Sequence, residues 1–201
     1  MTNFVPIYPL ETVVYPEETI KLTINDHKYI QLINDCFEEQ KELGIQVIID
    51  GKTMEYGTLI EITQLEKHQE EHYINVKAKG LQVFRVLETI HDIPEKKYSG
   101  AIVSYPENDK MKVHPSLSKL IIDEVKNLFE KLNIENVLPS EMQDWSSYEI
   151  AHKLGLTREQ EYELLSIFNE VQRMEFLRRY MNGIMPEVDD IELIKSRMNL
   201  N

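Results

Sequence analysis

The stretch "YGTLIEITQLEKHQEEHYINVKAKGLQVFRVLETI", residues 56–90, decides the fold class of this chain. Apolar and polar residues alternate over 56–66 and again over 73–90, which is the period of a strand with one buried face. Gly80 interrupts the second run and indicates a bulge or a tight barrel bend. The residues between the two runs are polar. The pattern therefore predicts two long strands joined as a hairpin.

Shorter β-branched runs on both sides of this stretch predict further strands at 15–24, 45–50 and 96–105. One helix is expected among them, capped by Asp26 and terminated by Gly44. Its apolar positions recur at helical spacing and are Tyr29, Leu32, Ile33, Cys36 and Phe37.

The pattern turns helical after the polar linker 106–115. One helix is expected to begin at Pro115, and a short one at Ser146, ending at Leu154 before Gly155. Another is expected from Thr157 to about Met181, and a last one over 187–198. The fold class predicted is α+β, with a mostly-β subdomain over 1–108 that holds one helix and an α-helical subdomain over 109–201.

The chain is acidic: 35 Asp and Glu residues against 22 Lys and Arg give 201 residues a net charge of −13. Nucleic acids and anionic membranes need clustered basic residues, and no basic run here exceeds two. We therefore expect no nucleic-acid or membrane partner, although a local basic patch stays open. The sequence shows no secretory signal and no apolar run of about 20 residues. The lone Cys36 excludes an internal disulfide, so the expected location is the cytoplasm.

His68-Gln-Glu-Glu71-His72 matches H-x-x-E-H, a zinc motif of metallopeptidases. That chemistry needs both histidines on one face of a helix, whereas here they lie between two predicted strands. On a strand they would lie about 13 Å apart, and only a tight loop could bring them together. We interpret the motif as a polar hairpin tip and keep a zinc hydrolase as a distant alternative.

Other catalytic signals are weak. Gly51-Lys52-Thr53 resembles the end of a P-loop, but Gln46 stands where that motif requires glycine, and a turn between two strands fits better. Cys36 lies on a predicted apolar helix face, and the sequence contains no G-x-S-x-G. A Ser–Lys dyad is neither visible nor excluded. We expect no enzyme activity, no catalytic residue, no metal and no cofactor.

The N-terminal segment "FVPIYPLETVVYPEETIKLTI" (4–24) resembles the start of the Lon protease N-terminal domain. The residues that match its opening pattern are Pro6, Ile7, Pro9, Leu10, Val13, Val14, Tyr15 and Pro16. "YGTLIEI", "INVKAKGLQVFRV" and "SSYEIAHKLGLTREQEYELL" then resemble later segments of that family in the same order. Glu17 departs from the pattern, because the family often has glycine there.

This resemblance implies a β-rich, PUA-like pseudo-barrel followed by a helical bundle, in a stand-alone substrate-binding domain without the ATPase and protease domains. It implies a non-catalytic module that binds unfolded or extended polypeptide segments and acts as an adaptor or regulator of proteolysis, with an ATP-dependent protease as a further partner. Tyr15 and Tyr148 are candidate peptide-binding residues, with packing as the competing role. The alternative is a PUA-like protein that binds a small ligand or RNA, and the net charge argues against RNA.

Overall fold

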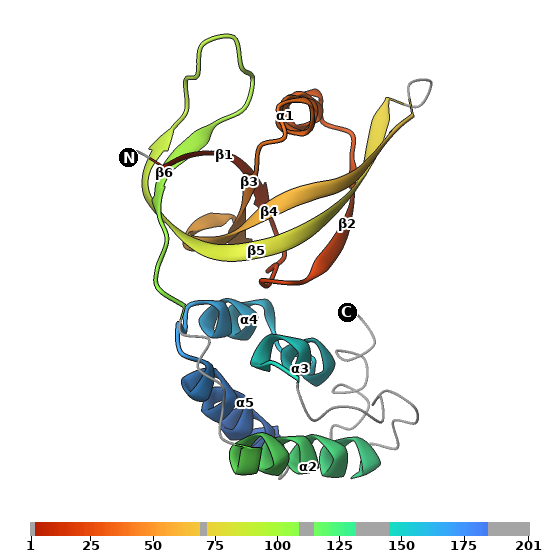
Figure 1. Ribbon diagram of the computed structural model, residues 1–201, viewed down its shortest axis with the longest axis vertical. Helices are drawn as coiled ribbons and strands as arrows, with labels where there is room; N and C mark the ends of the chain where they lie inside the picture. The colour runs from red at the N-terminus through yellow and green to blue at the C-terminus, as the bar shows by residue number, and fades with distance from the viewer. Residues whose placement is uncertain (1–2, 69–71, 109–114, 132–144, 185–201) are drawn as a thin grey trace. The chain divides into compact units, whose positions relative to one another are not determined.

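The computed structural model describes residues 3–68, 72–108, 115–131 and 145–184. The chain divides into two compact units, Met1–Pro106 and Glu107–Asn201, which are described separately (Figure 1). The subdomain boundary at 108 that the sequence suggests stays a prediction.

The first unit is a closed sheet with one helix. Its strands are β1 (Asn3–Leu10), β2 (Thr19–Ile24), β3 (Leu43–Ile49), β4 (Lys52–His68), β5 (Tyr73–Ile90) and β6 (Gly100–Ser104), and its helix is α1 (His27–Glu38). The sheet order is β2-β5-β4-β3-β1-β6, and β6 also pairs with β5, which closes the ring (Figure 1). With the helices that follow it along the chain, this sheet confirms the predicted α+β class.

Strand β1 joins two parts of the ring in succession. Its residues 3–6 pair with β6, and its residues 7–10 pair in parallel with β3. Pro6 and Pro9 lack the N–H that a strand paired on both sides would need. Because each half of β1 pairs on one side, both prolines are tolerated. Local pattern alone did not predict this strand.

The loop before β2 places Glu17 in a left-handed backbone conformation, at the position where the resemblance leads us to expect glycine. Pro16 and Glu17 form the middle of a turn in which the Glu18 N–H donates to the Tyr15 carbonyl at 3.2 Å. Glu17 has a φ of 68°, the value that the third position of a type II turn requires. The Glu17 N–H donates to the Gly80 carbonyl at 2.9 Å, and the Gly80 N–H donates to the Glu18 carbonyl at 2.8 Å. This is the bonding of a β-bulge whose first residue is left-handed.

Gly80 lets this loop approach β5 closely. A Cβ atom there would lie 2.2 Å from the Tyr15 carbonyl oxygen, so no larger residue fits. On the β4 side, the Thr58 hydroxyl donates to the Val14 carbonyl at 2.5 Å. The predicted bulge or bend at Gly80 is confirmed, since the β4–β5 register shifts between Leu59 and Ile60, opposite it.

The turn between β3 and β4 is the predicted one. Asp50 and Gly51 have φ values of 49° and 73°, the left-handed pair of a type I′ hairpin. Lys52 and Thr53 then begin β4, so the Gly-Lys-Thr sequence lies in a hairpin and not in a phosphate-binding loop.

Helix α1 begins as predicted and ends earlier. The Asp26 carboxylate accepts from the Lys28 N–H at 2.8 Å. Of the apolar positions at helical spacing, Leu32, Ile33 and Cys36 are buried against the sheet, whereas Phe37 is 41% exposed. The helix stops at Glu38, so the prediction that Gly44 terminates it is wrong.

Gly44 lies in β3, where the absence of a side chain leaves room for its neighbours. A Cβ atom there would lie 2.7 Å from the Phe84 ring and 2.8 Å from Ile7 Cδ1. Phe84 is fully buried in the second apolar cluster of the unit, whose members are Val5, Ile7, Leu59, Phe84, Ala101 and Val103. The larger cluster lies under α1 and is made of Val14, Ile24, Leu32, Ile33, Cys36, Leu43, Ile45, Ile60, Ile74, Val76, Ala78 and Tyr98.

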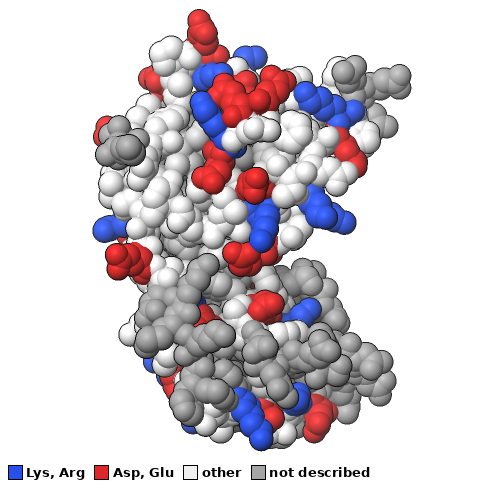
Figure 2. All heavy atoms as spheres, in the orientation of Figure 1, with Lys and Arg blue, Asp and Glu red and all other residues white. Residues whose placement is uncertain are grey.

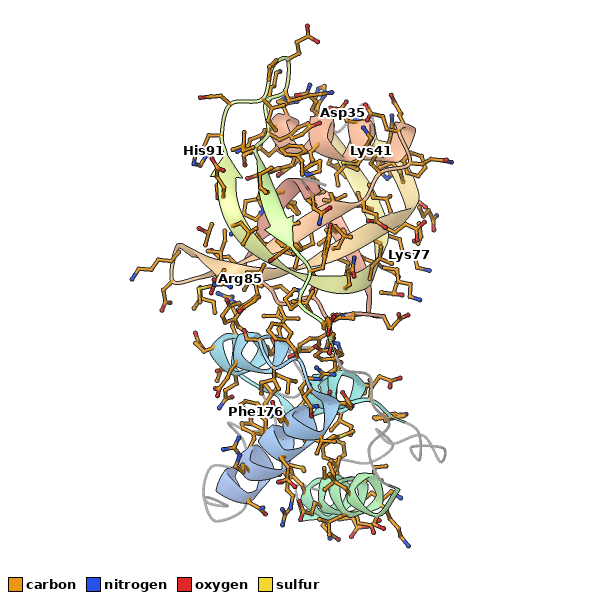
Figure 3. The ribbon with its side chains drawn as sticks, turned by 60° about the vertical axis from the view of Figure 1, so that its left-hand side comes forward. Asp35, Lys41, Lys77, Arg85, His91 and Phe176 are labelled. Atoms are coloured by element: carbon orange, nitrogen blue, oxygen red, sulfur yellow. The ribbon has the colours of Figure 1, made fainter. Side chains whose placement is uncertain are left out.

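Asp35 of α1 fixes the loop that leads to β6 (Figure 3). Its Oδ2 accepts from Lys96 Nζ at 2.8 Å and from the Tyr98 hydroxyl at 2.9 Å. Burial, followed by the hydrogen bond to Asp35, raises the pKa of Tyr98 well above its usual range. The Tyr98 hydroxyl therefore stays protonated and keeps donating this bond.

The second unit consists of helices in the described residues: α2 (Pro115–Lys131), α3 (Ser147–Leu154), α4 (Arg158–Leu165) and α5 (Glu170–Ile184). The predicted starts are confirmed at Pro115 and at Ser146 and Thr157, which both form capping boxes. Gly155 ends α3 with a φ of 63°, also as predicted. α5 packs against both α2 and α3.

The single helix expected from Thr157 to Met181 is wrong, because the chain breaks between α4 and α5. Ser166 ends α4, its hydroxyl donating to the Tyr162 carbonyl at 2.8 Å. Asn169 then opens α5, its side-chain oxygen accepting from the Gln172 N–H at 3.1 Å. The helix predicted over 187–198 lies outside the described residues.

A buried ion pair organises the second unit around this break. Arg173 is 2% exposed, and its guanidinium contacts the Glu170 carboxylate at 2.6 Å. It also donates to Ser147 Oγ at 2.9 Å, to Asn108 Oδ1 at 2.9 Å and to the Ile167 carbonyl at 2.6 Å. Glu170 in turn accepts from the Ser147 N–H and hydroxyl at 2.7 and 2.8 Å. The pair therefore ties the starts of α3 and α5 to the loop between α4 and α5.

Candidate functional site

A hollow of about 240 Å³ lies between the first turns of α1 and the end of the β4–β5 hairpin. The helix contributes His27, Ile30 and Asn34, which share one face because they are three and four residues apart. The hairpin contributes Lys67, His68, His72, Tyr73 and Ile74. The cap at Asp26 fixes where α1 begins.

The polar atoms that line the hollow differ in whether they have hydrogen-bond partners. Asn34 Oδ1 is buried and has no hydrogen-bond partner among the described residues. His68 Nε2 lies 3.3 Å from Asn75 Nδ2, and its ring stacks on Tyr73 with centroids 4.5 Å apart. Thr23 donates its hydroxyl to Asn75 Oδ1 at 2.9 Å, which leaves Asn75 Nδ2 as the donor to His68.

The H-x-x-E-H motif lies at the end of a hairpin. His68 is the last residue of β4 and pairs with Tyr73, the first residue of β5, while His72 has a φ of 57°. Residues 69–71 lie outside the described part of the chain. The strands predicted on both sides of the motif are confirmed, so its histidines do not share a helix face. In the residues that the structure describes, no group of three or more His, Cys, Asp or Glu side chains is placed to hold a metal ion.

Tyr15 is fully buried in the first unit. Its N–H donates to Glu18 Oε2 at 2.7 Å, within the loop that packs on Gly80. A peptide could reach the Tyr15 ring only if this loop opened. Its role in peptide binding stays a prediction.

Tyr148 is 7% exposed in the second unit. The guanidinium carbon of Arg173 lies 4.5 Å above its ring, which is a cation–π contact. Burial raises the pKa of Tyr148, with Arg173 acting in the opposite direction. Its role in peptide binding also stays a prediction.

Most of the residues lining the hollow were not singled out in the sequence. His27, Asn34 and Tyr73 carry no motif, and they meet only because α1 folds back over the hairpin. The one available signal was helical spacing, since Ile30 and Asn34 follow His27 by three and seven residues. His68 and His72 were identified as candidates for a different chemistry.

No helix in the described residues combines the length and the apolar character that crossing a membrane requires.

Comparisons with known proteins give a consistent family. The profile of the ATP-dependent protease La (LON) substrate-binding domain matches residues 5–183. Among solved structures, a Lon N-terminal domain protein from Xanthomonas campestris is similar, with a TM-score of 0.68, 22% identity, and coverage of 89% of this chain and 99% of that one. The N-terminal domain of the Mycobacterium avium complex Lon protease is similar with a TM-score of 0.64, 15% identity, and coverage of 90% and 98%. No curated protein matches. The chain therefore belongs to the LON substrate-binding domain family.

Proposed function

We propose that this protein is a non-catalytic module that binds unfolded or extended polypeptide segments. The observation that supports this most directly is the family match, which spans residues 5–183 and whose description names substrate binding. We further propose that the module acts as an adaptor or regulator of proteolysis, with an ATP-dependent protease as its partner.

The hollow beside α1 supports the proposal by its size and chemistry. Ile30, Tyr73 and Ile74 give it apolar walls, and about 240 Å³ accommodates one large apolar side chain. Asn34 Oδ1 offers an unused acceptor for a backbone N–H of the same segment. Such a site would favour unfolded chains, because folded proteins keep large apolar side chains and backbone N–H groups inside.

The first experiment compares one target protein in two states. Binding of the full chain to a reduced, carboxymethylated protein and to its native form is measured by fluorescence anisotropy. We expect binding to the unfolded form only. Equal binding to both forms, or to neither, would contradict the proposal.

Two variants on one helix then test the hollow. Ile30→Asp places a carboxylate in the hollow, and Phe37→Asp places one at an exposed apolar position of the same helix outside it. We expect Ile30→Asp to weaken binding about tenfold, which corresponds to the loss of one buried apolar contact. Phe37→Asp should bind as the unaltered protein does. Circular dichroism on both variants verifies that the fold is retained. Equal loss of binding in the two variants would show that the hollow is not the binding site.

The adaptor role needs a partner, which a pull-down from native cytosol would identify. We expect an ATP-dependent protease in the captured material and a change in its degradation rate when the purified protein is added. An unchanged rate would refute the adaptor role and leave polypeptide binding intact.

Nucleic-acid binding is not part of the proposal. On the face in Figure 2, Lys and Arg side chains alternate with Asp and Glu in the described residues and form no broad basic area. A salt-dependent RNA shift in a titration would revive the alternative, since phosphate binding requires clustered positive charge.

A further inference from the structure

The free edge of β2 is a second feature of the first unit that is suited to binding a polypeptide. β2 is the first strand in the sheet order and pairs on one side with β5 over Thr19–Ile24 (Figure 1). Among the described residues, no strand pairs with its other side. An open strand edge presents backbone N–H and C=O groups that another extended chain can bind.

The bulge at Glu17 and Glu18 shows which groups of β2 face outward. The Gly80 N–H bonds to the Glu18 carbonyl, so this position is a hydrogen-bonded one. In an antiparallel pair, bonded and non-bonded positions alternate. Counting from Glu18 along the uninterrupted register, Ile20, Leu22 and Ile24 bond to β5. Thr19, Lys21 and Thr23 therefore direct their N–H and C=O groups to the open edge.

This edge is more regular than the other open edge of the same ribbon. Beyond Ile60, β4 also pairs on one side, with β5. There the register shifts between Ile62 and Gln64, and such a bulge hinders the addition of a strand. β2 has no shift between Thr19 and Ile24. Regular geometry makes β2 the better of the two edges for strand addition.

Two unpaired lysines give this edge a charge preference. Lys21 and Lys77 lie directly opposite each other, at a non-bonded position where side chains are closest. Both are exposed, and neither forms an ion pair with a described carboxylate. Figure 3 shows Lys77 on the outer side of the sheet. Like charges in this arrangement repel, so an added strand with an acidic side chain beside them would be favoured.

We propose that the free edge of β2 binds an extended polypeptide segment as an added strand, and that Lys21 and Lys77 select segments carrying Asp or Glu. This inference rests on the proposed function and specifies which segments it concerns. Backbone bonding supplies affinity independently of sequence, and the lysine pair supplies selectivity. An exposed ion pair contributes up to about fivefold in affinity, so the preference is moderate.

Hydrogen exchange tests the edge directly in the full chain. Without peptide, the amides of Thr19, Lys21 and Thr23 should exchange quickly, and those of Ile20, Leu22 and Ile24 slowly. A short peptide of alternating valine and threonine with a central glutamate should slow the first set. If that peptide binds and leaves this set unchanged, the proposal is wrong.

One substitution blocks the open edge of β2 and keeps the hydrogen bonds between β2 and β5. Thr23→Pro removes an N–H that does not bond to β5, so the fold should survive, as circular dichroism would verify. Peptide binding should weaken about tenfold through the lost bond and its blocked neighbours. The control Thr23→Val removes the same hydroxyl and keeps the N–H, and should bind normally. Equal binding by both variants would overturn the proposal.

Charge reversal tests the selectivity. The double variant Lys21→Glu/Lys77→Glu should prefer a matched peptide with a central lysine over the one with glutamate, and an unchanged preference would refute the role of the lysines. If unfolded protein binds equally to the unaltered chain and to Thr23→Pro, the edge proposal fails and the proposed function stands. If nothing unfolded binds, both fail. A dimer that Thr23→Pro dissociates would show that a second copy occupies the edge, which also overturns the proposal.

Discussion

Replacing Arg173 by alanine tests how much the buried ion pair contributes to the second unit. The side chains of Arg173 and Glu170 are 3% and 12% exposed, so neither charge is well solvated. Arg173→Ala leaves the Glu170 carboxylate buried without its cation, and it leaves Asn108 Oδ1 and the Ile167 carbonyl without their donor. Removing one partner of a buried pair costs about 3–5 kcal/mol.

The lower end of that range applies here. Glu170 keeps two hydrogen bonds from Ser147, at 2.7 and 2.8 Å, which stabilise its charge in part. The cation–π contact with Tyr148 is also lost and contributes about 1 kcal/mol. We expect a loss of about 4 kcal/mol in the free energy of unfolding. With a urea dependence of about 2 kcal/mol per M, the unfolding midpoint should fall by about 2 M.

Trp145 is the single tryptophan of the chain and adjoins the capping residue of α3, so its fluorescence reports on this unit. Arg178→Ala on the same helix is the matched control. Arg178 is 38% exposed and contacts Glu124 and Glu175 at 3.5 and 3.4 Å, so its loss should cost less than about 1 kcal/mol. Equal midpoints for the two variants would refute the reasoning. So would additive losses in Arg173→Ala/Glu170→Ala, since the double variant leaves no unpaired charge.

Two further predictions concern the first unit. Gly80→Ala should destabilise the protein by about 3 kcal/mol in urea unfolding followed by circular dichroism, because its Cβ would lie 2.2 Å from a backbone oxygen of Tyr15. The control Gly183→Ala, at an exposed glycine of α5 in the second unit with open space around it, should be neutral or slightly stabilising, and a similar loss for both would contradict the packing argument. Burial raises the pKa of the Cys36 thiol from 9.0 to about 12, so the unfolded state loses this proton first as the pH rises. The free energy of unfolding should therefore fall between pH 9 and pH 12, more steeply than in Cys36→Ala, and parallel curves would contradict it.

Sequence pattern predicted those elements whose signals are local. The alternation over 73–90 predicted β5 with the bounds that the structure gives it. Ser146 and Thr157 predicted two helix starts, because a capping box needs only four neighbouring residues. The ordered family segments added the overall architecture, which no single motif could supply.

The wrong predictions involve residues whose role depends on distant parts of the chain. Gly44 looked like a helix terminator, but its glycine is required by the rings and side chains packed against β3. The apolar spacing from Leu164 to Val171 continues through the break between α4 and α5. Asn169 and Gln172 together have the spacing of a helix cap, a local signal that would have revealed the break.

The candidate site was harder to predict than the fold. The hollow is lined by His27 and Asn34 of α1 and by hairpin residues about forty positions later. The spacing of these residues in the sequence does not show that the two segments lie together. Which N–H and C=O groups of β2 point to its open edge follows from the hydrogen bonds of Gly80, and these depend on the turn at Glu17. The pattern of side chains does not show which backbone groups point outward, because those groups are the same in every residue.

The double pairing of β1 has a consequence for how the chain is made. Its first half pairs with β6, where Asn3 meets Val103, so the ring cannot close until most of the first unit has been synthesised. Contacts between residues so far apart form late and slowly. During translation, residues 3–6 have no partner strand until β6 has been made, whereas residues 7–10 can pair with β3 earlier. For that time, a newly made copy carries a short extended segment of the kind that the finished protein is proposed to bind.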